Sequence, residues 1–183
     1  MILYECMPQK NLKKISGLVM ILACVALLLF FVTSTYTDLP FRWVFQLCGF
    51  GCISAIIYIT VRYISRAYIY AIFKNKDGSL DLTVTELSNG GKKRITVCRV
   101  SLGSLEEVFV CDKRNAEDKR RADGILANAK KEKRKRFNYI QSMGAPDVCL
   151  ITLTECDEPL LITLERDGQL EKYLSGELGA TEE

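Results

Sequence analysis

Two long apolar runs near the start of the 183-residue chain constrain its fold more than any other feature. Ile15–Val32 contains 18 residues without a charge, and Trp43–Val61 contains 19. Because a helix of about 20 apolar residues crosses the roughly 30 Å hydrocarbon layer of a bilayer, each run is long enough for one crossing. The short link between them suits a tight turn, in which Pro40 fits because it cannot continue a helix. The pattern predicts a transmembrane helical hairpin with helices at 15–36 and 43–64 and an external turn at 37–42.

Two other interpretations fit parts of this pattern. Lys10, Lys13 and Lys14 precede the first run, as basic residues do in a secretory signal peptide. The run is longer than the apolar region of such peptides, however, and no small-residue cleavage motif follows it. A buried pair of core helices would show a polar face on each helix, and neither run has one. The hairpin therefore explains the pattern best.

Basic residues flank the outer ends of this hairpin. Besides the three lysines before the first run, Arg62 and Arg66 follow the second, whereas the turn holds only Arg42. The positive-inside rule places both ends of such a hairpin in the cytoplasm. We therefore expect a multi-pass plasma-membrane protein in which residues 1–14 form a cytoplasmic N-terminal segment.

The second run is rich in small residues. Gly51 and Ala55 have the spacing that lets helix backbones approach closely, as do Cys48 and Cys52 around Gly49. We expect Gly49, Gly51 and Ala55 to pack against the first helix or against a helix of a partner. The alternative is that small residues are simply tolerated at these positions.

After residue 64 the pattern changes to short alternating segments separated by turn residues. Seven segments are typical of β-strands: 67–73, 79–87, 92–100, 105–111, 136–143, 148–156 and 160–165. In the third of these, Ile95 and Val97 are expected on the inward face. Ser88–Gly91 indicates a hairpin turn, since Asn and Gly accept positive φ. From Asp167 the leucines follow a helical spacing, which predicts a final amphipathic helix.

Seven antiparallel strands followed by one helix can form two packed sheets whose open end the helix plugs. This order, the aromatic residues Tyr68 and Tyr70 in the first strand, and the step Ser101-Leu102-x-x-Leu105 into the fourth resemble the pleckstrin-homology-like (PH-like) superfold. More narrowly, the chain resembles bacterial membrane proteins in which a transmembrane α-hairpin precedes a PH-like domain. The resemblance implies a PH-like cytoplasmic domain at 65–179, built as a seven-stranded orthogonal sandwich or barrel capped by the C-terminal helix. An acidic tail at 180–183 follows.

A charged insertion at 112–135 departs from this pattern. Residues 112–136 contain 11 Lys/Arg and 5 Asp/Glu, a local charge of +6, whereas residues 137–183 carry −8. Asn115, followed by acidic residues, predicts a helix N-cap, and Gly124 is expected to separate two short helices. Because the domain has no room for a second core, we expect the insertion to project into solvent or onto the membrane.

The insertion leads into a dense basic run, which is the strongest candidate for a binding surface. Its candidate contacts to anionic lipid or an acidic partner are Lys130, Lys131, Lys133, Arg134, Lys135 and Arg136. On a helix these charges would surround the circumference and leave no apolar face, so the run would act by electrostatic attraction rather than by insertion. A solvated helical loop is the alternative. Contact with nucleic acid is disfavoured because no aromatic residues are interleaved with the charges.

The composition excludes much catalytic and metal chemistry. The chain has no histidine, so it forms neither a Ser-His-Asp triad nor a His-ligated zinc site. Its eight cysteines include no C-x-x-C pair, and in a reducing cytosol they are expected to act as small apolar groups. The adjacent carboxylates Glu106-Glu107 and Asp157-Glu158 should point to opposite faces of their strands and form no dyad. We expect no catalytic residue, no cofactor and no metal.

These features favour a non-enzymatic, membrane-anchored binding or scaffold module that presents its β-domain to the cytoplasm. Its partner would be another protein, bound as an added strand at a sheet edge or as a helix in a groove. One alternative is a sensor of the anionic membrane surface that acts through the basic run, and another is a small accessory subunit of a transport or envelope complex. The expected partners are the lipid bilayer and an unidentified protein, with a homo-oligomer left open.

Overall fold

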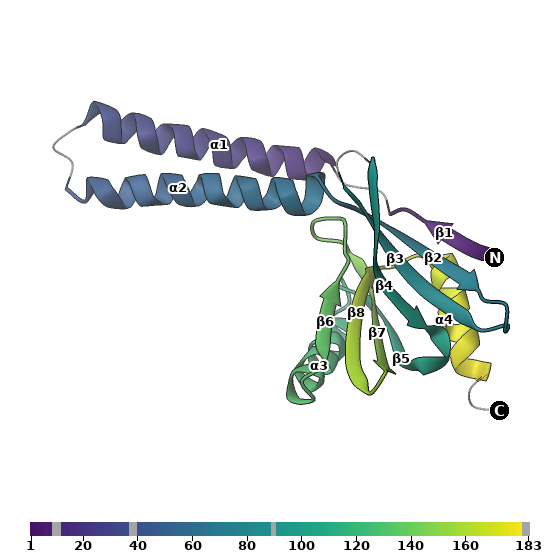
Figure 1. The fold of residues 1–183 in the computed structure, drawn as a ribbon. Coiled ribbons are helices and arrows are strands. Elements are labelled where there is room, and N and C mark those ends of the chain that lie inside the picture. Colours follow the sequence, from purple (N-terminus) through teal and green to yellow (C-terminus); the bar gives the residue numbers. More distant parts are fainter. Residues whose placement is uncertain (9–11, 37–39, 89–90, 181–183) are drawn as a thin grey trace. The chain divides into compact units, whose positions relative to one another are not determined.

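The computed structural model describes residues 1–8, 12–36, 40–88 and 91–180 (Figure 1). The chain divides into two compact units. The hairpin unit is Lys10–Arg66, and the second unit combines Met1–Gln9 with Ala67–Glu183 to form a β-domain. The N-terminal residues therefore belong to the same folded unit as the chain that follows the hairpin.

The hairpin unit consists of two helices, as the apolar runs predict. The first helix, α1, is Leu12–Thr35, and α2 is Arg42–Ile59, which continues as a π-helical segment at Thr60–Ile64. Both helices are long and apolar enough to cross a membrane. Of the predicted turn at 37–42, residues 37–39 lie outside the described residues.

The β-domain contains two four-stranded sheets. Sheet A has the order β1-β2-β3-β4, and these strands are Ile2–Cys6, Ala67–Lys74, Leu80–Ser88 and Lys93–Ser101. Sheet B has the order β5-β7-β8-β6, and β5 to β8 are Leu105–Asp112, Lys135–Asn138, Asp147–Glu155 and Glu158–Glu165. The seven predicted strands are present, but β1 is additional, and β6 runs parallel to β8 instead of antiparallel.

β1 lies within the N-terminal segment for which no strand is predicted. It pairs antiparallel with β2, and Cys6 lies opposite Tyr70, although the whole hairpin separates the two strands in sequence. Its five residues are too few for a periodicity argument, and the pairing that stabilises them is not local. The start of the predicted cytoplasmic segment 1–14 therefore completes sheet A.

The main core lies between the two sheets and includes the C-terminal helix α4 (Gly168–Ala180). Leu170 and Leu174 of α4 are buried there, which confirms the predicted final helix. The sheets contribute side chains that include Tyr70, Ile72, Leu82, Val84, Ile151, Leu153, Ile162 and Leu164. Complete burial of one leucine side chain contributes about 1.5–3 kcal/mol, so α4 contributes substantially to the stability of the domain.

β4 differs from the expectation that Ile95 and Val97 lie in the core. A register shift between Val84 and Thr85 adds one residue to β4 as a β-bulge. Cys98 lies opposite Val84 and packs against the core, and Val97 is the extra residue of the bulge. Ile95 lies opposite Glu86, on the same face as Val84 but beyond the core, so Ile95 and Val97 are 44% and 36% exposed. Strict alternation does not anticipate this arrangement, because a shift of one residue exchanges the two faces of a strand.

β6 is shorter than the strand predicted at 136–143. It ends at Asn138, and the buried Tyr139 accepts a hydrogen bond at its carbonyl from the Tyr70 hydroxyl at 2.8 Å. The amide of Gln141 then donates to the buried carboxylate of Glu165 at 2.9 Å. Side-chain partners here replace the backbone pairing that would have continued the strand.

The charged insertion folds as a single helix, α3 (Ala116–Lys131). Asn115 caps it as predicted, because its Oδ1 accepts the amide of Glu117 at 3.0 Å. The expected division into two short helices is wrong, since Gly124 lies inside the continuous helix.

α3 covers one face of sheet B and does not project into solvent or onto the membrane as a free arm. Ala122 and Ala129 are buried against sheet residues such as Phe109 and Leu150. Ile125 and Leu126 complete an apolar stripe with helical spacing. The expectation of a projecting insertion is therefore wrong: the stripe was present in the sequence, but the surrounding charges obscured it.

Candidate functional site

A backbone turn after α3 disperses the predicted basic run. The amide of Arg134 donates to the Ala129 carbonyl at 2.9 Å, and the amide of Lys133 donates to the Lys130 carbonyl at 3.3 Å. Lys133 has a φ of 56°, so the turn is a Schellman motif with lysine in the position that glycine usually takes. The six predicted contact residues consequently fall into three groups: Lys130 and Lys131 in α3, Lys133 and Arg134 in the turn, and Lys135 and Arg136 in β6.

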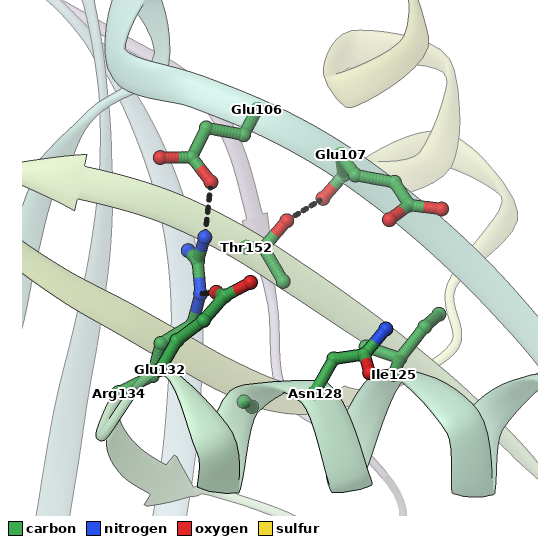
Figure 2. Close-up of a pocket in the computed structure, with 8 residues that line it drawn as sticks. Glu106, Glu107, Ile125, Asn128, Glu132, Arg134 and Thr152 are labelled. Carbon is green, nitrogen blue, oxygen red and sulfur yellow. Dashed lines mark hydrogen bonds and ion pairs between the residues drawn. The ribbon is translucent and has the colours of Figure 1, made fainter.

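Arg134 points back toward sheet B, where it forms two ion pairs (Figure 2). Its side chain is only 14% exposed, and its guanidinium lies 2.8 Å from Glu106 and 2.5 Å from Glu132. The hydrogen bond to Glu132, together with the Glu106 carboxylate, raises the pKa of Arg134 although burial opposes this. An external anion would therefore have to compete with two internal carboxylates for Arg134.

The pKa of Glu106 is lowered by two neighbours. The Thr154 hydroxyl donates to the Glu106 carboxylate, which is the main cause, and Arg134 adds to this effect although partial burial opposes it. Glu106 therefore carries its negative charge at neutral pH and holds Arg134 in place. The sequence offers little signal for this network, since Glu106, Glu132 and Arg134 come from a strand, the end of a helix and a turn.

The two residues of β6 also have partners within the domain. The Lys135 ammonium lies 2.5 Å from a carboxylate oxygen of Glu158, and the Arg136 guanidinium donates to the Leu126 carbonyl. All of the predicted contact residues except Arg134 are exposed, so both side chains still reach solvent. A role of these residues and of the three lysines in binding anionic lipid or an acidic partner stays a prediction.

A cavity of about 280 Å³ lies between α3 and sheet B, next to Arg134 (Figure 2). Its lining consists of Glu106, Glu107, Ile125, Asn128, Ala129, Glu132, Arg134 and Thr152. Hereafter this cavity is called the α3 groove. Ala129 and Ile125 of α3 contribute to its lining, and both belong to the apolar stripe that packs on sheet B.

The exposed charges of the α3 groove are mainly negative. The side chains of Glu106, Glu107 and Glu132 are 40%, 47% and 54% exposed, whereas that of Arg134 is only 14% exposed. Arg121 lies beside the groove, where it pairs with Glu107 at 3.3 Å and covers the Phe109 ring at 4.7 Å. The groove therefore favours a cationic group over an anionic one.

Glu106 and Glu107 both line the groove, contrary to the expectation that they point to opposite faces. The register of β5 shifts between Leu105 and Glu107, which interrupts the alternation of side chains. Figure 2 shows the two carboxylates pointing away from each other, with only that of Glu106 directed at Arg134.

The structure separates the three predicted packing residues of the hairpin. A Cβ atom added at Gly49 would lie 2.9 Å from the ring of Phe30 in α1, so Gly49 allows the close approach of the two helices. Gly51 is exposed and has nothing within 4 Å of an added Cβ, while Ala55 is half-buried. The predicted packing against the first helix is thus shown for Gly49, and a contact of Gly51 with a partner's helix stays a prediction.

The outer edge of β4 is closed at two points. The Tyr139 hydroxyl donates to the Val97 carbonyl at 3.3 Å, and the Ser101 amide donates to Glu155 at 3.3 Å. Side chains that bind the edge of a strand in this way reduce its capacity to pair with another chain. Of the two predicted modes of protein binding, the groove is therefore better supported than strand addition at β4.

The cysteines of the β-domain differ in exposure. Cys149 and Cys111 are buried, Cys6 and Cys98 are half-buried, and Cys156 is exposed. Burial raises the pKa of Cys149 to about 12, so its thiol stays protonated at neutral pH. Among the residues that the structure describes, no group of three or more Cys, Asp or Glu side chains is arranged to hold a metal ion.

Comparisons with protein-family models, with curated proteins and with solved structures find no match to this chain.

Proposed function

We propose that this protein is a membrane-anchored, non-catalytic binding module that displays its β-domain on the cytoplasmic face of the plasma membrane. The pairing of β1 with β2 carries the proposal. β1 precedes α1 and β2 follows α2, so a single folded domain is built from the chain on both sides of the hairpin. Two crossings return the chain to the side that it left, as this pairing requires, whereas one crossing would separate the paired strands. The lysines and arginines that flank the hairpin support the cytoplasmic side.

We also propose that the β-domain has a PH-like fold. Two four-stranded sheets that share one core with a C-terminal helix support it. β1 and the parallel strand β6 are additions to the seven-stranded pattern. Because one fold serves many functions, the kind of partner has to be argued from the α3 groove.

A short basic segment of another protein is the partner that we propose for the α3 groove. The volume of about 280 Å³ lies just below the roughly 300–1,000 Å³ of common small-molecule sites, which favours one or two inserted side chains over a free metabolite. Glu107 and Glu132 each pair with an arginine of the domain, but their carboxylates are 47% and 54% exposed and can accept a further hydrogen bond from a lysine or arginine of the partner. Asn128 and Ile125 on α3 add a hydrogen-bonding group and an apolar contact.

Photo-crosslinking in cells that express the full chain tests this proposal. A photoreactive residue replaces Asn128, which lines the groove, or Ala127, its exposed neighbour, which does not line it. We expect Asn128 to capture a protein through a segment that contains Lys or Arg, and Glu107→Lys to abolish this product. Equal capture from both positions, or capture that survives Glu107→Lys, would contradict a protein-binding role of the groove.

The side of the membrane is tested separately with a protease site at the C-terminus. We expect the site to resist protease added to intact cells and to be cut after the membrane is permeabilised. Cutting in intact cells would show that the β-domain is displayed outside, and would leave the groove proposal to be judged by the crosslinking.

A further inference from the structure

Sheet A has one end at which the chain leaves the β-domain. Ala67, the first residue of β2, directly follows Arg66, the last residue of the hairpin unit. In the register of the sheet, Ala67 lies opposite Leu87 of β3, and Leu87 lies opposite Arg94 of β4. Adjacent strands are about 4.8 Å apart, so Arg94 lies on the order of 10 Å from the point where the chain enters the hairpin.

The residues at this end of β4 are basic and apolar. Lys92, Lys93 and Arg94 are exposed, and they take part in no ion pair among the described residues. Ile95 follows them and is 44% exposed. Glu86, which lies opposite Ile95 on β3, is the neighbouring acidic residue. Residues 92–95 are hereafter called the basic turn.

We infer that the basic turn docks onto an anionic membrane surface. Three positive charges followed by an exposed isoleucine suit a surface with negative headgroups above an apolar layer. A basic residue near such a surface strengthens its attachment about fivefold. The continuous chain at Ala67 keeps the basic turn within roughly one Debye length of the residue that leads into the hairpin, so the attraction is only partly screened by salt.

The basic run at 130–136 is less suited to the same role. Arg134, Lys135 and Arg136 have partners within the domain, namely two carboxylates, one carboxylate and one backbone carbonyl. Among the described residues, neither Lys130, Lys131 and Lys133 nor the three charges of the basic turn take part in an ion pair. The basic turn differs in that all of its charges lack such a partner, in its exposed isoleucine, and in its place beside the residue that leads into the hairpin. The basic turn, and not the basic run at 130–136, is therefore the segment that contacts the anionic membrane.

The opposite end of sheet A offers a matched control. Ile2 in β1 lies opposite Phe73, near the far end of β2, and is 52% exposed. Ile2 and Ile95 are thus exposed isoleucines of the same sheet at opposite ends of its strands. The chain contains a single tryptophan, Trp43, so its replacement by Phe gives a background in which one new tryptophan reports on one position.

The experiment uses the full chain with Trp43→Phe, reconstituted in vesicles that contain acyl-brominated lipids, which quench tryptophan on contact. Ile95→Trp is compared with Ile2→Trp in neutral phosphatidylcholine and in the same lipid with phosphatidylglycerol. We expect Ile95→Trp to be quenched more than Ile2→Trp in the anionic vesicles, and the difference to shrink in neutral vesicles or at high salt.

The second part of the experiment removes positive charges by substitution with glutamine. Lys92→Gln, Lys93→Gln and Arg94→Gln together should weaken the docked state by on the order of 100-fold and remove the extra quenching of Ile95→Trp. Lys130→Gln, Lys131→Gln and Lys133→Gln remove the same charge elsewhere and should leave the quenching unchanged. Equal quenching at the two tryptophans, no dependence on anionic lipid, or an equal effect of both triple variants would overturn the inference. None of these results bears on the α3 groove, which is tested by crosslinking.

Discussion

The hydroxyl of Tyr4 in β1 donates a hydrogen bond of 2.5 Å to Asp167, the residue that caps α4. The same Asp167 oxygen accepts the amides of Gln169 at 2.9 Å and Leu170 at 3.2 Å. One carboxylate therefore both starts the C-terminal helix and secures the N-terminal strand. Because β1 is the part of the domain that precedes the hairpin, this contact joins the two ends of the β-domain.

Replacing Tyr4 by phenylalanine removes this hydrogen bond and keeps the aromatic ring. We expect Tyr4→Phe to lower the free energy of unfolding by about 1.5–3 kcal/mol, the range for hydrogen bonds to charged groups. Urea unfolding of the full chain in detergent, followed by the β-sheet signal, measures the change. Tyr58→Phe, an exposed position in α2, is the matched control. Equal unfolding midpoints for Tyr4→Phe and the wild-type chain would show that the contact adds nothing.

Asp167 should also make the domain sensitive to acid. Burial opposes ionisation of Asp167, but hydrogen bonds from Tyr4 and from the Leu170 and Gln169 amides outweigh it and hold its pKa below the usual value of 3.8. Because the pKa is lower in the folded state than in the unfolded state, ionised Asp167 stabilises the fold at pH values above the unfolded-state pKa. This stabilisation is lost as the pH falls through the folded-state pKa. Asp167→Asn should therefore lose less stability than wild type on acidification from about pH 5 to pH 3. Urea titrations at both pH values measure these losses. If wild type and Asp167→Asn lost the same free energy of unfolding between the two pH values, Asp167 would not have this role.

The two glycines of α2 should respond differently to a large side chain. We expect Gly49→Leu to force α1 and α2 apart, because an added Cβ already meets the Phe30 ring at 2.9 Å. Gly51→Leu meets open space and should leave the hairpin intact. Thermal stability of the full chain in detergent compares the two variants. If Gly51→Leu were the more damaging of the two, the helix packing described above would be wrong.

Lys133 offers a stabilising substitution. Its φ of 56° is costly for a residue with a Cβ and free of strain for glycine. We expect Lys133→Gly to raise the free energy of unfolding by about 0.5–1 kcal/mol, and Lys131→Gly, inside α3, to lower it by a similar amount. Urea titration of both variants checks the opposite signs. A loss of stability in Lys133→Gly would mean that the lysine side chain contributes more than its backbone costs.

The cysteines should divide into fast and slow classes of alkylation. Cys156 is exposed and should react with a water-soluble maleimide in the native protein. Cys149 is buried and its pKa is raised to about 12, so it should react only after urea unfolds the domain. Peptide mass spectrometry after timed labelling distinguishes the two. Rapid native labelling of Cys149 would indicate that the core opens far more readily than the packing implies.

Local patterns in the sequence were sufficient for most individual elements. The uncharged runs predicted both helices of the hairpin because a span of that length and composition requires no tertiary information. Asn115 identified the start of α3, and the leucine spacing after Asp167 identified α4, because capping and helical periodicity are properties of neighbouring residues. The absence of histidine likewise limited the available chemistry from composition alone.

The tertiary structure decided how these elements meet. The sequence does not show that Ile2–Cys6 pairs with β2, because this pairing crosses the hairpin and its energy comes from a distant strand. The bulge in β4 and the Schellman turn at Lys133 likewise redirect side chains that strict periodicity assigns to the opposite face or to a helix. The sequence by itself therefore determined the elements and the charges, whereas only the fold decided which charges pair internally, as Arg134 does, and which take part in no ion pair among the described residues, as in the basic turn.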